Sequence, residues 1–338
     1  MKQKNYNIEI MRVAAFVMVI VIHVSNYFCR AYGTISNGEY IYSLVINSLA
    51  RVSVPCFFMM SGALLLGRTE SISKNMKRVG RFLMVLVIWS IIYYLFNTYY
   101  SHQDTFGLSN FLEKPAEAHL WYLYVMIPVY LMLPFLQAMC RGMDQKAETA
   151  FAMIGTIWII ALHLMSYEKM SLYYDLPILG DRSYIYYLFM GYFITKYIPK
   201  IKIKNGYLFI IFAGGALLNV VITALCSEPR LDHYERTLEY GNPLVLISAL
   251  AFFTFIMRIG NGNVSLSDKW KERINVCCSC SFGIYLVHIM LLDNYKIHVK
   301  ADVYSAYAMI PVLVIAILIT SFGMVYLLRK LPFGKQIT

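Results

Sequence analysis

Ten apolar segments recur along the chain, each long enough to cross a lipid bilayer as a helix. About twenty apolar residues are needed for one such crossing. The runs are continuous rather than alternating in polarity, which favours helices over barrel strands. The sequence therefore predicts an all-α integral membrane protein of about ten transmembrane helices, with 183–198 as the shortest and weakest span. The expected spans lie at roughly 9–28, 42–66, 82–100, 120–139, 149–166, 183–198, 207–226, 243–259, 276–293 and 305–328.

The composition agrees with burial in lipid. Only 14% of the 338 residues are charged and 59% are hydrophobic, whereas soluble domains carry about 25% charged residues. A net charge of +11 would suggest nucleic-acid binding in a soluble protein. Here the basic residues lie in short connections between apolar runs, where Lys and Arg act as topology signals. We therefore expect the lipid bilayer, and no nucleic acid, as a partner of this chain.

The distribution of Lys and Arg predicts the orientation. If the N-terminus is cytoplasmic, twenty of the thirty basic residues lie on the cytoplasmic side and eight outside, while Arg12 and Arg51 lie within spans. Because basic residues favour cytoplasmic loops, both termini are expected in the cytoplasm. We expect 1–330 to form the transmembrane domain and 331–338 a cytoplasmic tail. That tail is either the natural end or a cut before a soluble domain, and the first span lacks the cleavage pattern of a signal peptide.

Cysteines and loop acids give weaker signals. The seven cysteines show no spacing typical of a disulfide framework or a zinc site, so no metal is expected. The Cys-Cys-Ser-Cys cluster at 277–280 is interpreted as small buried residues near the cytoplasmic leaflet. The acidic residues of the longest outer loops, about 101–118, 167–182 and 227–242, are interpreted as solvated charge. A cover over a polar acceptor is the alternative.

A few ionisable side chains lie inside the expected spans, where they are costly and usually face a protein interior or a cavity. Arg12 and His23 are eleven residues apart, which places them on one helix face about 16 Å apart, and Glu9 lies one turn before Arg12. Arg51 is expected about 12 Å below the outer end of the second span. His23 and His288 are expected at a similar depth, so the three side chains should converge in one layer, with Arg12 at the cytoplasmic mouth.

These residue types suit a reaction that joins two sides of a membrane. A neutral imidazole can take a proton from a hydroxyl, and a guanidinium can hold an oxyanion or a phosphate through a bidentate fork. No mid-span Asp or Glu is available to orient His23, so a Ser-His-Asp triad is not indicated. Structural interpretations remain open: a hydrogen-bonded structural histidine at His23, snorkelling of Arg12, carbonyl contacts of Arg51, an interfacial anchor at His119 and Trp121, and a helix–helix contact at His288.

Four segments in this order resemble motifs of acyltransferase family 3, membrane proteins that include O-acetyltransferases of bacterial surface polysaccharides and peptidoglycan. Each motif is weak alone, but the four together cover nearly the whole chain. They are Glu9-Ile-Met-Arg12 followed after ten residues by His23; Arg51-Val-Ser-Val-Pro55 continuing to Ser61-Gly62; His119-Leu-Trp121-Tyr122-Leu123; and Ser281-Phe-Gly283-Ile-Tyr285-Leu-Val-His288.

The resemblance implies transfer of an acyl group, usually acetyl, from cytoplasmic acyl-CoA to a hydroxyl of a cell-envelope glycan or small polar acceptor. Acetyl-CoA would be a donor substrate rather than a tightly bound cofactor, and the chain would lie in the bacterial cytoplasmic (inner) membrane. The resemblance implies His23 as the catalytic base or acyl relay, with Arg12 and Arg51 binding the donor or stabilising an oxyanion. It implies as substrate-binding residues Glu9, Ser61, His119, Trp121, Tyr122, Tyr285 and His288.

A second branch offers an alternative function. The membrane halves of the membrane-bound serine racemases of vancomycin resistance resemble this family, and there a soluble racemase follows the last span. The segment Leu331-Pro332-Phe333-Gly334 would suit such a junction, and the membrane half would then take up or deliver L-serine. The chain contains no racemase segment and hence no candidate pyridoxal phosphate lysine. No inverted repeat with matching broken helices is evident, which weighs against transport, and a buried Arg51 weighs against a scaffold.

Overall fold

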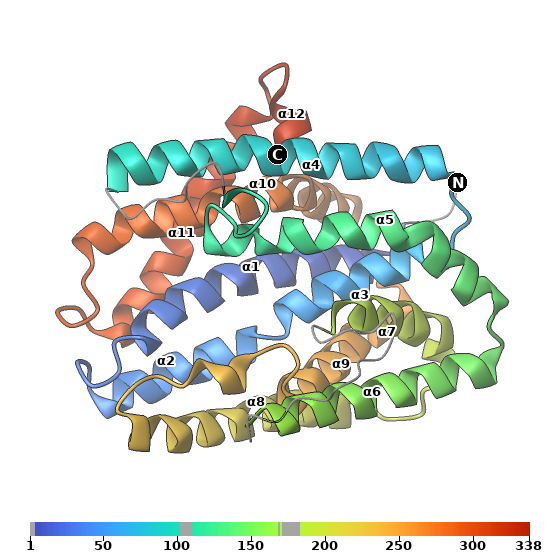
Figure 1. Ribbon diagram of the computed structural model, residues 1–338, viewed down its shortest axis with the longest axis horizontal. Coiled ribbons are helices and arrows are strands. Elements are labelled where there is room, and N and C mark those ends of the chain that lie inside the picture. The colour runs from blue at the N-terminus through green and yellow to red at the C-terminus, as the bar shows by residue number, and fades with distance from the viewer. Residues whose placement is uncertain (1–3, 102–109, 168–169, 171–182) are drawn as a thin grey trace.

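The computed structural model describes residues 4–101, 110–167, 170 and 183–338, and within these ranges the chain is helical with no β-strand. Most of the long helices run side by side along the long axis of the molecule (Figure 1). The α-helices are α1 (Tyr6–Cys29), α2 (Asn37–Ala50), α3 (Ser53–Leu65), α4 (Ile72–Phe96), α5 (Trp121–Gly142), α6 (Gln145–Tyr167), α7 (Tyr184–Tyr197), α8 (Asn205–Ser227), α9 (Pro243–Arg258), α10 (Asp268–His298), α11 (Ala306–Leu328) and α12 (Gly334–Ile337).

The predicted all-α membrane fold is confirmed. Nine helical segments of the described chain are long and apolar enough to cross a membrane. The expected span at 183–198 corresponds to α7, which has 14 residues and is therefore about 21 Å long, less than a hydrocarbon core of about 30 Å. The cytoplasmic location of both termini stays a prediction.

The second span is interrupted where it was expected to be continuous. It consists of α2 and α3, and Arg51 and Val52 form the turn between them. The cause is local: Pro55 lies four residues after Arg51 and has no N–H to donate to its carbonyl, while the proline ring crowds that same carbonyl. Arg51 thus occupies a break in the helix rather than its regular interior.

Two glycines bring α3 and α7 into backbone contact. A Cβ added at Gly62 would lie 1.6 Å from the carbonyl oxygen of Leu188, and one at Gly191 would lie 1.8 Å from that of Met59. Small residues permit this close approach between membrane helices. The reciprocal contact fixes α3, whose Val54 and Phe57 line the cavity described below.

The centre of the bundle is α1, which contacts α2, α3, α9, α10 and α11. Figure 1 shows it in the middle of the molecule, with α4 along one edge and α6 and α8 along the other. One apolar core cluster gathers residues of α3, α5, α7 and α9, and a second gathers residues of α4, α10 and α11; both also include residues of α1. The polar face of α1 described next is bordered by both clusters.

The segment expected as a cytoplasmic tail packs against the bundle. The indole Nε1 of Trp89 in α4 donates a hydrogen bond of 2.9 Å to the carbonyl of Ile337. Thr338 is buried, and its carbonyl accepts a hydrogen bond of 3.1 Å from Arg329. These contacts tie residues around α12 to α4 and α11.

Candidate functional site

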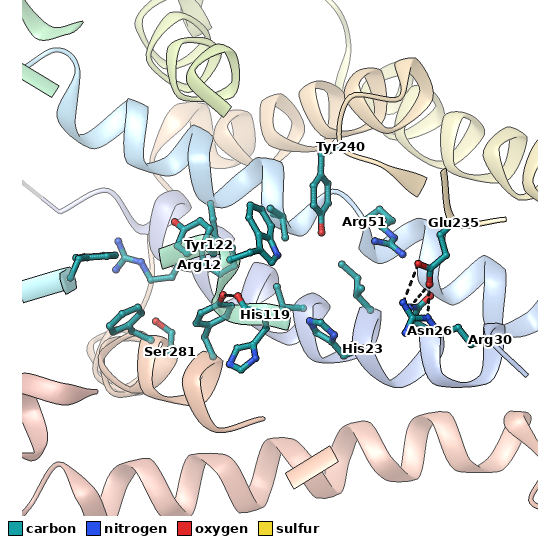
Figure 2. A pocket seen from close by; sticks show the side chains of 18 residues that line it. Arg12, His23, Asn26, Arg30, Arg51, His119, Tyr122, Glu235, Tyr240 and Ser281 are labelled. Carbon is teal, nitrogen blue, oxygen red and sulfur yellow. Dashed lines mark hydrogen bonds and ion pairs between the residues drawn. The ribbon is translucent and has the colours of Figure 1, made fainter. Parts of the chain in front are cut away.

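A cavity of about 390 Å³ lies beside α1, with walls from α1, α3, α4, α5 and α10 and from the segment before α9. Figure 2 shows its labelled side chains in a row from Arg12 at one end to Arg30 at the other. Its lining contains Arg12, Val19, Ile22, His23, Asn26, Arg30, Arg51, Val54, Phe57, Phe82, His119, Trp121, Tyr122, Glu235, Tyr240, Ser281, Phe282 and Tyr285.

One face of α1 forms the length of this cavity. Arg12, Val19, His23, Asn26 and Arg30 follow one another at intervals of seven, four, three and four residues, which is the spacing of one helical face. The first and the last are eighteen positions apart, which corresponds to about 27 Å along the helix axis. That length approaches the thickness of the hydrocarbon core, about 30 Å, so the cavity follows most of a membrane crossing.

Arg12 marks one end, where its guanidinium forms a 2.7 Å ion pair with Glu9. This is the pairing expected from their spacing. Lys4 lies 3.6 Å from the same carboxylate, and the thiol of Cys278 donates to the carbonyl of Glu9. The carboxylate of Glu9 thus holds the Arg12 guanidinium at this end of the cavity. Cys278 and Cys280 are buried free thiols, as expected for part of the cysteine cluster, whereas Cys277 is half-buried.

Three histidines meet in the middle of the cavity. The ring centre of His288 lies 5.1 Å from that of His23 and 5.2 Å from that of His119. His288 Nδ1 lies 2.6 Å from the carbonyl of Tyr285, so Nδ1 carries the proton and Nε2 carries the lone pair. Nε2 of His288 and both ring nitrogens of His119 are buried without a protein partner among the described residues. His23 and His119 thus line the cavity, and the unpartnered Nε2 of His288 belongs to the ring that packs against both of them.

Arg51 faces the same cavity from the break between α2 and α3. Its Nε donates a 2.8 Å hydrogen bond to Asn47, and Asn47 in turn donates to the carbonyl of Ile22 and the hydroxyl of Ser25. This network fixes Arg51 beside the turn of α1 that contains His23, the residue after Ile22. The expected convergence of His23, Arg51 and His288 is therefore present in the structure, while their chemical roles stay predictions.

The other end of the cavity carries an ion pair that the sequence analysis missed. Glu235 accepts hydrogen bonds of 2.7 and 3.1 Å from Arg30 and one of 2.9 Å from Asn26. Glu235 was interpreted as a solvated loop charge; its side chain is 41% exposed, but it also lines the cavity. A usable signal existed, because Asn26 and Arg30 continue the helical stripe of Arg12 and His23.

Aromatic rings form the opposite wall. Trp121 packs against Tyr184 and Tyr240, with ring centres 5.3 and 6.0 Å apart. Tyr122 and Tyr285 have ring centres 5.8 Å apart, and the Tyr285 hydroxyl donates to the carbonyl of His119. His119 is 2% exposed and both side chains line the cavity, whereas an interfacial anchor would lie on the outer surface of the bundle.

Some residues implied as substrate-binding lie outside the lining. The Ser61 hydroxyl donates to the carbonyl of Phe57, one turn earlier in its own helix. Glu9 lies behind Arg12, and His288 lies behind His23. Within the described part of the chain, no group of three or more His, Cys, Asp or Glu is placed to hold a metal ion.

Comparison with known proteins shows which family the chain belongs to. The profile of a family described as an acyltransferase domain matches residues 5–329. The chain is 22% identical over 345 aligned residues to an amino-acid racemase of Enterococcus faecalis, in an alignment that covers 95% of this chain and 46% of the racemase. The chain thus spans about half the length of that relative. No solved structure was found to match it. With its helices apolar enough to span a membrane and a family match over nearly its whole length, the chain belongs to acyltransferase family 3.

Proposed function

We propose that this protein transfers an acyl group, acetyl in the simplest case, from cytoplasmic acyl-CoA to a hydroxyl of a cell-envelope acceptor in the bacterial inner membrane. Family membership supports membrane acyltransferase activity in general. The observation that carries the finer proposal is the cavity along α1, which has cations at both ends and His23 between them. Such a cavity suits a donor that enters from one side of the membrane and an acceptor that enters from the other.

The donor is proposed to enter at Arg12. A guanidinium is suited to phosphate oxygens, and acyl-CoA carries its phosphates at the end opposite the thioester. Arg12 and His23 are eleven residues apart on α1, so about 16 Å separates them along the axis. An extended pantetheine arm would bridge this interval and bring the thioester beside His23.

His23 is proposed as the general base. Its imidazole takes the proton of the acceptor hydroxyl while the hydroxyl oxygen attacks the thioester carbonyl. The new C–O bond forms, the C–S bond breaks, and the proton passes to the departing CoA sulfur, so the histidine returns to its neutral state. The positive charge of Arg51 stabilises negative charge beside His23, both charge that develops in the transition state and charge carried by a bound substrate.

The test is acetyl-CoA turnover by the purified protein in lipid nanodiscs. We expect His23→Gln to lower turnover by about 100-fold or more, the usual contribution of general base catalysis. His298→Gln is the matched control, because His298 is exposed at the end of α10 and lies outside the cavity. Full activity of a folded His23→Gln protein would remove His23 from the mechanism, and no turnover by the wild type with any acceptor would refute the proposed function.

A second candidate function is uptake or delivery of an amino acid such as L-serine. It is favoured by the similarity to an amino-acid racemase and by the break at Arg51, because broken helices often form substrate sites in transporters. Labelled L-serine uptake into proteoliposomes without any acyl donor would support this candidate. Acyl transfer without such uptake would support the first.

A further inference from the structure

The charges of the cavity do not balance. Arg12 is paired with Glu9, and Arg30 is paired with Glu235. Arg51 also lines the cavity, but among the described residues no ion pair includes it. The positive charge of Arg51 therefore has no carboxylate within ion-pair distance in the described part of the chain, unlike the charges of Arg12 and Arg30.

The rest of the Arg51 side chain is prepared for a ligand. Its Nε is held by Asn47, which is fully buried and anchored to α1. The Arg51 side chain, which lines the cavity, also lies within hydrogen-bonding reach of the Tyr240 hydroxyl. Figure 2 shows Tyr240 extending its hydroxyl into the space between Arg51 and His23. A guanidinium and a phenol hydroxyl, both hydrogen-bond donors, thus face the same part of the cavity.

The location of Arg51 assigns this part of the cavity to the acceptor rather than to the donor. In the row of cavity residues, Arg51 lies beyond His23 on the side of Arg30 and Glu235, away from Arg12 (Figure 2). A donor that enters at Arg12 and places its thioester at His23 does not reach past His23 in the proposed function. The molecule that meets Arg51 is then the one that enters from the Arg30 end.

We propose that the acceptor carries a single negative charge, of the carboxylate type, close to its reactive hydroxyl. A guanidinium fork matches a carboxylate through two parallel hydrogen bonds. The unpaired positive charge of Arg51 matches one negative charge, and the carboxylate of nearby Glu235 disfavours a second. Asn47, which holds Arg51, donates to the carbonyl of Ile22, the residue before His23. Arg51 and His23 are therefore close, so the anionic group of the acceptor must lie close to its attacking hydroxyl. This inference rests on the proposed function for the role of His23.

The test compares three acceptors of one skeleton: glycerate, with one negative charge, glycerol, with none, and glycerol phosphate, with about two. For the wild type we expect glycerate to have the lowest KM. We expect Arg51→Gln to raise the ratio of the KM for glycerate to the KM for glycerol by about 10- to 100-fold, the value of hydrogen bonds to a charged group. Arg51→Lys keeps the positive charge but loses the paired donors of the guanidinium, so its KM for glycerate should lie between those of the wild type and Arg51→Gln. Arg141→Gln is the control, since Arg141 lies outside the cavity and donates to the carbonyl of Arg68.

The outcomes separate the two proposals. An equal fall of kcat for all three acceptors in Arg51→Gln would mean that Arg51 serves the reacting carbonyl oxygen, and would overturn the acceptor anion. A lower KM for glycerol phosphate than for glycerate would overturn the single charge. If no acceptor is acylated at all, Tm shifts decide, since a ligand that binds only the folded state raises the Tm. If glycerate raises the Tm of the wild type but not that of Arg51→Gln, the anion site is supported although the proposed acyl transfer is refuted. If none of the three compounds raises the Tm of the wild type, the anion site is refuted as well.

Discussion

The close contact between α3 and α7 predicts a large effect of one methyl group. In Gly62→Ala the new Cβ would lie 1.6 Å from the carbonyl oxygen of Leu188, whereas ordinary contacts begin at 3.4 Å. The two backbones must therefore separate by about 1.8 Å, the difference between these distances. Overpacking a core costs about 1–3 kcal/mol where side chains can yield. Here the obstacle is backbone, so we expect the upper end, about 3 kcal/mol.

The assay is thermal unfolding of the purified protein in one detergent, with acetyl-CoA turnover measured on the same samples. At about 2 °C per kcal/mol for a chain of this size, the Tm of Gly62→Ala should fall by about 6 °C. Turnover should also fall, because α3 carries Val54 and Phe57 to the cavity wall. Gly214→Ala is the matched control: nothing lies within 4 Å of its added Cβ, and alanine favours a helix interior over glycine by about 0.5–1 kcal/mol. Equal Tm values for the two variants would refute the packing argument.

Three further predictions concern the surroundings of the cavity. Asn47→Ala should lower the free energy of unfolding by about 1–3 kcal/mol and raise the KM of the acceptor, because Arg51 loses its support; an unchanged KM would contradict this. Glu235→Gln should lower the Tm little, since its pair with Arg30 is largely exposed, yet tighten binding of glycerate. Burial lowers the pKa of His233 to about 4 from 6.5, so its contribution to stability is present above pH 6.5 and is lost towards pH 4; a His233→Asn protein should show a smaller fall of Tm over that range.

Much of the fold follows from local properties of the sequence. Continuous apolar runs define the helices. Two helices begin before their apolar run, with a charged first part: α4 begins at Ile72 and α10 at Asp268. The stripe that contains Arg12 and His23 follows from helical periodicity alone. The depths of Arg51 and His288 follow from counting residues along a rod of known rise.

The remainder depends on contacts between distant segments. Glu235 reaches the cavity because the segment before α9 is fixed to α8, where Asn219 donates to the carbonyl of Thr237. No local pattern in the sequence predicts such a contact. The break at Arg51, in contrast, has a local signal in Pro55, four residues later, which removes one hydrogen bond of the helix. Ser61 was implied by the family motif, but it lies outside the cavity lining, and its hydroxyl donates to the carbonyl of Phe57 in its own helix.

The central claim is that water reaches the middle of the bundle beside α1, and cysteine labelling tests it most directly. In a background without native cysteines, Val54→Cys places a thiol on the cavity wall, Val52→Cys one at a fully buried position, and Ile91→Cys one on the exposed outer face of α4. Only a thiol in contact with water forms the reactive thiolate. We predict that a membrane-impermeant thiol reagent labels the protein at position 54 alone, and that acetyl-CoA slows this labelling. Labelling at position 91 but not at 54 would contradict the account.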